Sequence, residues 1–333
     1  MKSVHVPHLG RAVKLGGRTR PDPHAPMLKL SRYMRAAALP PVPPTSDYSP
    51  AAMNVISNIY DNDTLGCCVI AEAGHFVGVE TGNAGDLYTY TDDQIIADYS
   101  AIGGYVPGDP STDQGCDEVT ALNYYSQHGY ANGTKLLGYL AVDPTNQQEV
   151  MFAMWAFENL MFGIELPDAW ISPFPSSSGF VWNDGTPDEN NGHCVGGCGH
   201  NATGIQIMTW AMIGTITYAA IAHLCSASAN GALYVRLTPD QLGKAMAKTP
   251  SGFAWADLIA DFDSLGGNVP VPTPPGPPPP PPPPPTPGAP PTLAQAIAWA
   301  QSQLPSSFFT TSATAKNAVA KGLTANWPAS TSK

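Results

Sequence analysis

The sequence has few charged residues and few cysteines for its length. Asp, Glu, Lys and Arg make up 12% of the 333 residues, about half of the share found in an average soluble protein. Six cysteines are too few to hold a chain of this length together by disulfides. The formal charge of −11 disfavours nucleic acid as a partner. Apolar residues still make up 43%, so a sizeable hydrophobic core is expected.

The sequence also lacks a recognisable signal peptide and a convincing membrane span. The basic residues near the N-terminus are not followed by an apolar stretch, because Pro7, Gly10 and Gly16 interrupt it. Residues 205–225 contain no Asp, Glu, Lys or Arg and are long enough to cross a bilayer. Several polar residues within them, and the missing Lys or Arg at their ends, instead favour a buried strand followed by a core helix.

The charges are unevenly distributed along the chain. Residues 1–35 hold eight Lys or Arg and one acid, which gives +7. Residues 36–270 give −21, and residues 271–333 give +3. A basic arm ahead of an acidic body can fold back onto it or bind an acidic partner. The simpler expectation is a solvated tail that partly neutralises its own domain.

Composition divides the chain into four segments. Residues 1–50 form a basic arm rich in Pro and Gly, with little regular structure expected. Residues 51–268 form the body. Residues 269–291 are a polyproline linker that includes nine consecutive prolines, and such a run forms a stiff polyproline II helix. Residues 292–333 fit a small helical hairpin. Its core is marginal, so we expect it to bind a virion protein or a host protein.

Within the body, helical patterns come first and strand patterns later. The spacing of apolar residues predicts helices over 67–80, 113–128, 149–160 and 215–224, and strands over 162–166, 194–198, 205–209 and 232–237. This order predicts an α+β body rather than repeated βαβ units.

A cysteine follows a polar turn at the start of the first predicted helix. The stretch Asn62-Asp63-Thr64-Leu65-Gly66-Cys67-Cys68 leads directly into apolar residues. A cysteine in the first turn lies at the positive end of the helix dipole, which stabilises the thiolate. Because the thiolate is the nucleophile of cysteine hydrolases, Cys68 is a candidate nucleophile. The alternative is that Cys67 and Cys68 are a buried apolar pair.

A histidine in a strand of small residues is the candidate base. It lies in Gly192-His193-Cys194-Val195-Gly196-Gly197-Cys198-Gly199-His200. His193 lies 125 residues after Cys68, and Thr209 lies 141 residues after Cys68. In papain-type enzymes the His and Asn typically lie about 130–150 residues after the nucleophilic Cys. The side chains of His193, Cys194, Cys198 and His200 also resemble zinc ligands. Alternation along a strand points His193 away from the other three, so no metal site is expected.

These stretches resemble papain-like cysteine peptidases, and most closely the papain-fold proteins of tailed phages and prophages. The resemblance rests on Asn62–Cys68, Ser111–Cys116 and Gly192–Val195, and it covers about residues 55–240. It implies a papain-like body with a helical half and an antiparallel strand half. It also implies a location in the cytoplasm of a host cell or in a virion.

The resemblance also implies roles for four residues. Cys68 stands at the position of the nucleophile and His193 at that of the base. Asn62 lies where the family has the Gln of the oxyanion hole. Thr209 is nearest to the Asn that orients the histidine. The first cysteine of the family signature is absent, so the family's structural disulfide cannot form. No cofactor is implied.

Three functions remain open on the sequence alone. The first is a papain-like cysteine hydrolase that cleaves peptide or isopeptide bonds of a peptide or protein substrate. The second is a non-catalytic virion or accessory protein that uses the fold as an interaction module. The third is a peptidoglycan endopeptidase or amidase. Asp184, Asp188 and Glu189 make the approach to His193 acidic. We expect these acids to raise the pKa of the imidazole and to favour basic substrates.

Overall fold

The computed structural model describes residues 1–20, 22, 27–35 and 38–265. The predicted polyproline linker and helical hairpin lie outside the described residues. Within the described part, no helix has the length and apolar character needed to cross a membrane.

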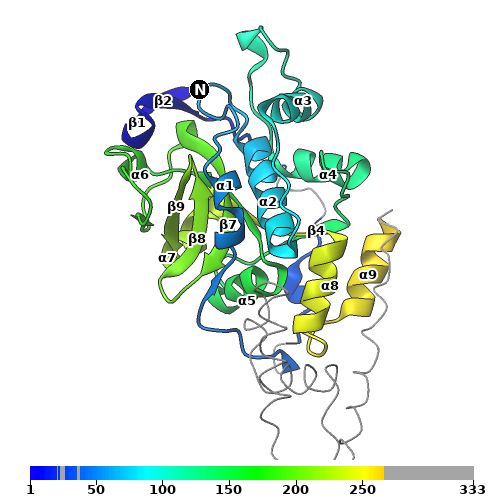
Figure 1. Cartoon of the computed structure of the whole chain (residues 1–333). Coiled ribbons are helices and arrows are strands. Elements are labelled where there is room, and N and C mark those ends of the chain that lie inside the picture. The colour runs from blue at the N-terminus through cyan, green and yellow to red at the C-terminus, as the bar shows by residue number, and fades with distance from the viewer. Residues whose placement is uncertain (21, 23–26, 36–37, 266–333) are drawn as a thin grey trace, which may run out of the picture. The chain divides into compact units, whose positions relative to one another are not determined.

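One half of the body is helical. It contains α1 (Met53–Ile56), α2 (Cys68–Ala84), α3 (Asp92–Gly103) and α4 (Glu118–His128). The ends of these helices follow local signals. Thr91 and Gln94 form a capping box at the start of α3, and α2 ends at Gly85, whose φ of +89° suits glycine. Figure 1 shows α2 at the centre of the molecule, beside the sheet.

The other half is an eight-stranded sheet with the order β4-β10-β5-β7-β8-β9-β6, and β3 also pairs with β7. The pairs are antiparallel except β6–β9. The strands are β3 (Ser46–Asp47), β4 (Gly138–Ala141), β5 (Leu160–Glu165), β6 (Val181–Trp182), β7 (Gly192–His200), β8 (Gly204–Thr209), β9 (Met212–Thr217) and β10 (Ala232–Leu237). The remaining helices are α5 (Gln147–Phe157), α6 (Asp168–Ile171), α7 (Tyr218–Leu224), α8 (Pro239–Lys248) and α9 (Trp255–Ser264).

The α+β prediction is therefore confirmed, and several elements differ from it in detail, including α4 and β9. The helix predicted over 113–128 begins only at Glu118, because the side chain of Asp117 accepts a hydrogen bond from the N–H of Thr120 and caps the helix there. The segment predicted as a helix over 215–224 begins as the end of β9. Every second residue of β9 is buried, which is the period of a strand, and α7 starts only after Thr217.

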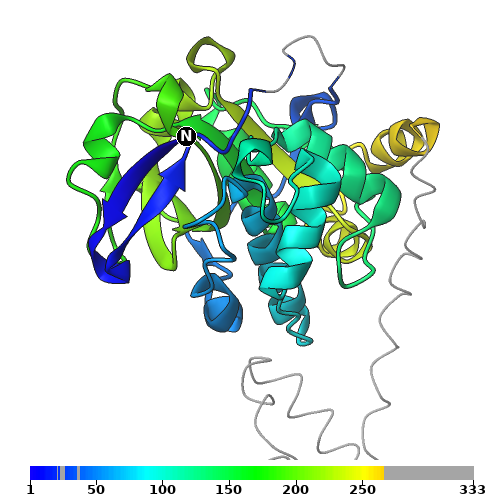
Figure 2. The same cartoon turned by 90° about the horizontal axis from the view of Figure 1, so that it is seen from above.

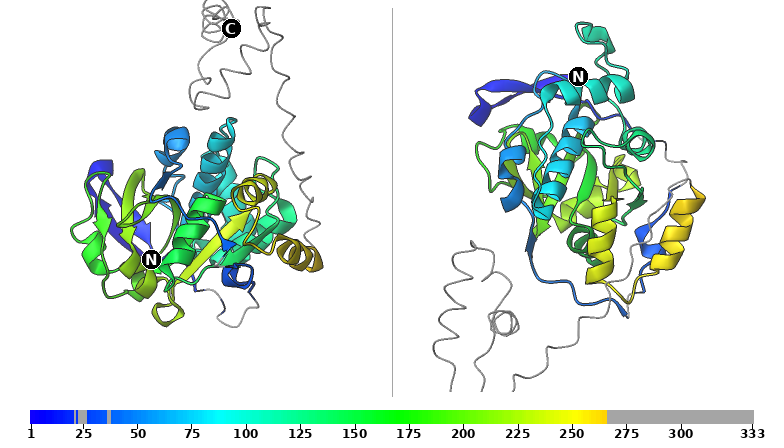
Figure 3. Two further views of the ribbon diagram at one scale, coloured as in Figure 1. Left: turned by 90° about the horizontal axis from the view of Figure 1, so that it is seen from below. Right: turned by 45° about the vertical axis from the view of Figure 1, so that its right-hand side comes forward.

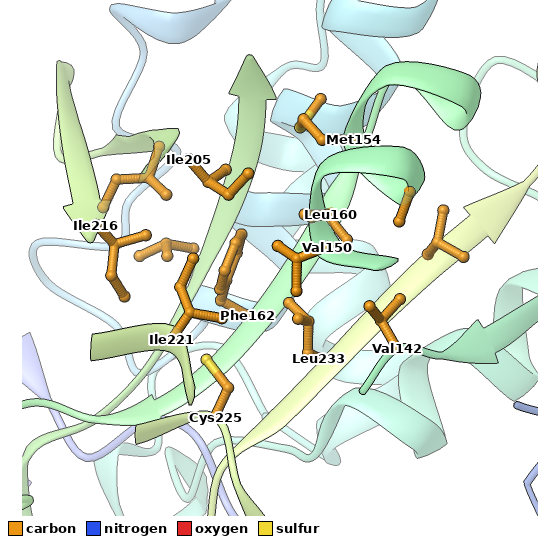
Figure 4. Close-up of a cluster of buried hydrophobic side chains, with 14 of the residues drawn as sticks. Val142, Val150, Met154, Leu160, Phe162, Ile205, Ile216, Ile221, Cys225 and Leu233 are labelled. Atoms are coloured by element: carbon orange, nitrogen blue, oxygen red, sulfur yellow. The ribbon is translucent and has the colours of Figure 1, made fainter. Parts of the chain in front are cut away.

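The largest hydrophobic core lies between the sheet and the helices α5 and α7 (Figure 4). Val150 and Met154 from α5 and Ile221 from α7 meet Phe162 and Leu233 from the strands. All five are essentially inaccessible to solvent. Helices α8 and α9, yellow in Figure 3, lie at the end of the body away from the N-terminus.

Helix α2 packs closely on β7, and a buried ion pair joins the two halves. A Cβ atom at Gly196 would lie 2.7 Å from Oε1 of Glu72, so the glycine leaves room for that carboxylate. Nη1 and Nη2 of Arg236, on β10, each donate to a different oxygen of Glu72 at 2.7 Å. Both side chains are at most 2% exposed. The guanidinium also lies 3.8 Å from the ring centre of Phe76.

The described residues of the basic arm fold back onto the body and contain regular structure, which corrects the expectation that the arm has little of it. Strands β1 (Lys2–Val6) and β2 (Arg11–Leu15) form an antiparallel hairpin. This hairpin lies beside the strand half (Figures 1 and 2). Six arm residues form ion pairs with acids of the body: Lys2–Asp168 (2.8 Å), Arg11–Asp63 (2.8 Å), Lys14–Asp113 (2.7 Å), Arg18–Glu118 (2.6 Å), Arg20–Glu165 (2.8 Å) and Arg32–Asp261 (3.3 Å). Arm and body belong to one compact unit.

The first prediction concerns the ion pair between the halves. We expect Arg236→Ala to lower the free energy of unfolding by about 3–5 kcal/mol, because it leaves Glu72 buried without its partner. Urea unfolding measures the loss. The matched control is Arg32→Ala, since Arg32 is 63% exposed and pairs with Asp261 at 3.3 Å; we expect that change to cost at most about 1 kcal/mol. Equal losses in the two variants would contradict the prediction.

Candidate active site

The two adjacent cysteines at the start of α2 have different surroundings. Cys67 is the N-cap residue, and its carbonyl accepts hydrogen bonds from the N–H groups of Ile70 and Ala71. Its thiol donates to the carbonyl of Tyr60 at 3.4 Å. Cys68 is the first residue of the helix and lines a small cavity between the two halves. Only the second cysteine therefore borders the cavity.

His193 lies near the start of β7, and its ring contacts two consecutive residues at the end of β8 and in the turn after it. Its Nε2 lies 3.0 Å from Oγ1 of Thr209, the last residue of β8. The indole of Trp210 stacks on the imidazole with ring centres 4.0 Å apart and planes inclined by 7°. Trp210 has a φ of +43° in the two-residue turn between β8 and β9. A positive φ is energetically costly for a bulky residue. The stacking of Trp210 on His193 was not predicted from the sequence.

All four predicted site residues line the same cavity. Asn62, Cys68, His193 and Thr209 border a space of about 10 Å³, which is close to the room that one water molecule needs. Nδ1 of His193 and Oδ1 of Asn62 are buried and have no hydrogen-bond partner among the residues that the structure describes. The site is thus polar, closed, and supplied with an unpaired ring nitrogen.

Burial determines the protonation of the two central groups. It raises the pKa of Cys68 to about 12, although the backbone N–H of Cys194 lowers it somewhat. It lowers the pKa of His193 to about 3. At neutral pH both groups are therefore uncharged. Desolvation of the buried thiol therefore outweighs the stabilisation of the thiolate that is expected from the helix N-terminus.

The acidic residues before His193 do not act on it as expected. Asp184 pairs with His223 at 2.7 Å. Asp188 accepts hydrogen bonds from the backbone N–H and the side chain of Asn190, and Glu189 pairs with Arg20 at 3.3 Å. The prediction that this approach raises the pKa of the imidazole is wrong, because burial dominates and lowers it.

The arm crosses the junction between the two halves next to the cavity. The N–H of Gly16 donates to the carbonyl of Gly192 at 2.9 Å, on the strand half. On the helical half, the N–H of Cys116 donates to the carbonyl of Gly17, and the N–H of Thr19 donates to the carbonyl of Cys116, both at 3.1 Å. A Cβ atom at Gly17 would lie 2.6 Å from the carbonyl carbon of Gly66. The arm thus packs between the loop that precedes Cys68 and the strand that carries His193.

The zinc-like residues of β7 are used in other ways. Nδ1 of His200 lies 2.6 Å from Oγ of Ser46, and Nε2 lies 2.9 Å from the carbonyl of Pro43. The thiol of Cys198 donates to the carbonyl of Gln206 at 3.7 Å. In the described part of the chain, no group of three or more His, Cys, Asp or Glu residues is arranged to hold a metal ion.

The fold resembles solved structures of cysteine proteases. Xylellain, a cysteine protease from Xylella fastidiosa, superposes with a TM-score of 0.52 at 13% identity, over 68% of this chain and 97% of xylellain. The fold is papain-like. Digestive procathepsin L2 from Tenebrio molitor gives a TM-score of 0.47 at 15% identity, over 67% of this chain and 78% of its own. No family model matches the sequence, and no curated protein matches it. The likeness to phage and prophage proteins stays a prediction.

The second prediction concerns acid. Because the pKa of His193 is lowered to about 3, the unfolded chain binds a proton between about pH 6.5 and pH 3 that the folded chain does not. This histidine therefore reduces the free energy of unfolding as the pH falls, by up to about 1.4 kcal/mol per pH unit. Urea unfolding at several pH values should give a shallower acid slope for His193→Gln than for the unaltered chain. His5→Gln, at an exposed position of the arm, is the control and should keep the slope.

Proposed function

We propose that the protein is a papain-like cysteine hydrolase of peptide bonds, with Cys68 as nucleophile and His193 as base. The observation that carries the proposal is the shared cavity of Asn62, Cys68, His193 and Thr209. Nδ1 of His193 has no partner there, whereas Nε2 is held by Thr209. One ring nitrogen is thus anchored and the other is free to exchange a proton.

The proposed reaction uses these groups in turn. The thiol of Cys68 gives its proton to Nδ1 of His193, and Sγ attacks the carbonyl carbon of the substrate. The side-chain amide of Asn62 and the first-turn N–H of Cys68, which has no intrahelical acceptor, stabilise the negative oxygen. The C–N bond breaks while His193 returns the proton to the leaving amine. A water molecule, activated by the same ring, then hydrolyses the thioester and restores the thiol.

Thr209 acts as a positioning residue in this proposal. When Nε2 of His193 carries the ring hydrogen, it donates to Oγ1 of Thr209, and the lone pair lies on Nδ1. A hydroxyl has a single oxygen and rotates freely, so it orients the ring less firmly than a carboxamide does. The stacked indole of Trp210 covers the imidazole and limits its rotation.

The third prediction tests the nucleophile. We expect slow cleavage of a peptide library by the full-length chain, measured by mass spectrometry after long incubation, and complete loss of that cleavage in Cys68→Ala. A peptidyl epoxide should form an adduct that peptide mapping locates on Cys68. Cys67→Ala is the matched control, because Cys67 contacts the carbonyl of Tyr60 and does not line the cavity; it should keep cleavage and adduct formation.

Two outcomes would contradict the proposal. One is cleavage that survives Cys68→Ala, and the other is an adduct on a cysteine other than Cys68. A folded chain that neither cleaves peptides nor forms the adduct would favour the interaction module instead.

A further inference from the structure

Arg18 differs from the other basic residues that attach the arm to the body. The side chains of Lys2, Arg11, Lys14 and Arg20 are 32–54% exposed in their ion pairs. The side chain of Arg18 is 1% exposed and that of its partner Glu118 is 0% exposed. The arm therefore inserts one arginine into the body, while its other cations stay at the surface.

The pocket around Arg18 matches a guanidinium group. Nε donates to Oε1 of Glu118 at 2.6 Å, and Nη1 donates to the backbone carbonyl of Asn230 at 2.7 Å. The wall consists of bare backbone at Gly163, where a Cβ atom would lie 2.5 Å from Nε of Arg18. Burial lowers the pKa of Arg18, but Glu118, together with Cys194 and Tyr234, raises it, and the pKa lies above its usual value. The guanidinium stays charged, so the pocket is built around a cation.

This pocket adjoins the candidate active site. The carbonyl oxygen of Arg18 lies 2.7 Å from the position of a Cβ atom on Gly192, which directly precedes His193. Both members of the pair act on the thiol, since Glu118 raises the pKa of Cys68 and Arg18 lowers it. A cation in this pocket thus offsets part of the effect of Glu118 on the pKa of the proposed nucleophile.

We infer that the Arg18 pocket receives an arginine side chain of the peptide substrate, with Glu118 as the specificity-determining residue. The arm occupies the pocket as a competing segment of the same chain. The inference rests on the proposed function. Arginine fits better than lysine, because the two acceptors, on Glu118 and Asn230, are matched by two nitrogens of one planar group. An ammonium is a single point charge on a flexible stem.

The contacts of the arm allow its exchange for a substrate. Nη2 of Arg18 and Oε2 of Glu118 are both buried without a hydrogen-bond partner, so the arm satisfies the pocket incompletely. The surface ion pairs of the arm contribute little to its attachment and weaken with salt. An empty pocket, however, would leave Glu118 as an unpaired buried carboxylate. Exchange of Arg18 for an arginine of the substrate is therefore more favourable than leaving the pocket empty.

The test measures binding separately from cleavage. The probe is a fluorescent peptide with the sequence of residues 14–20, Lys-Leu-Gly-Gly-Arg-Thr-Arg, and its two analogues carry citrulline or lysine at the position of Arg18. The binding protein is the full chain with Gly17→Val and Arg18→Ala. The first change introduces a clash with the backbone of Gly66 and the second empties the pocket. Faster amide hydrogen exchange in residues 11–20 verifies that the arm is released.

We expect the arginine peptide to bind about tenfold or more tightly than the citrulline peptide, with lysine between them. Adding Glu118→Gln should abolish the difference between arginine and citrulline. Gly243→Val is the matched glycine control, because nothing lies within 4 Å of a Cβ atom there, and it should leave the arm protected. In the unaltered chain, an excess of the arginine peptide should also speed exchange in residues 11–20, whereas the citrulline peptide should not.

Equal affinity for arginine and citrulline, or no binding to an arm-released chain, would overturn the inference. So would an arginine preference that survives Glu118→Gln. The two proposals fail separately. Selective binding of the arginine peptide without any cleavage would reject the hydrolase and support the arginine pocket. Cleavage of the library without preference for arginine would support the hydrolase and reject the arginine pocket.

Discussion

The relative position of the two halves depends on the buried contact between α2 and the sheet. Glu72 lies one turn after Cys68 on α2, and its carboxylate fills the space that a side chain at Gly196 would take. The same carboxylate holds Arg236 of β10 through two hydrogen bonds. Glu72 shares its helix with Cys68, and Gly196 shares its strand with His193, so this contact joins the two elements that carry the thiol and the imidazole. Removing the charge of Glu72 or of Arg236 would therefore weaken both the contact between the halves and the packing around the cavity.

Much of this arrangement could be predicted from local patterns in the sequence. The helix that begins at Cys68 and the strand that carries His193 follow from the spacing of apolar and small residues. The resemblance added Asn62 and Thr209, and all four side chains border one cavity. The start of α4 and the existence of β9 were missed, because each depends on a cap or on burial that becomes visible only in three dimensions.

The protonation states and the arm could not be predicted in the same way. The dipole at the start of α2 and the acids before His193 are visible in the sequence, but the depth of burial that overrides both is not. The positive charge of the arm is equally visible, yet the sequence favoured a solvated tail. The decisive contacts join Gly16 to Gly192 and Gly17 to Cys116. They are backbone hydrogen bonds between distant segments, and such pairings leave no mark in side-chain patterns.

The order of arm and body along the chain has a consequence for biosynthesis. The arm is made before the body, and Glu118 follows Arg18 by 100 residues and Glu165 follows Arg20 by 145. Until these two acids have been made, Arg18 and Arg20 lack their partners. Cys68 is likewise made before the strand that buries it. The strand half can therefore cover the thiol of Cys68 only after β7 has been made.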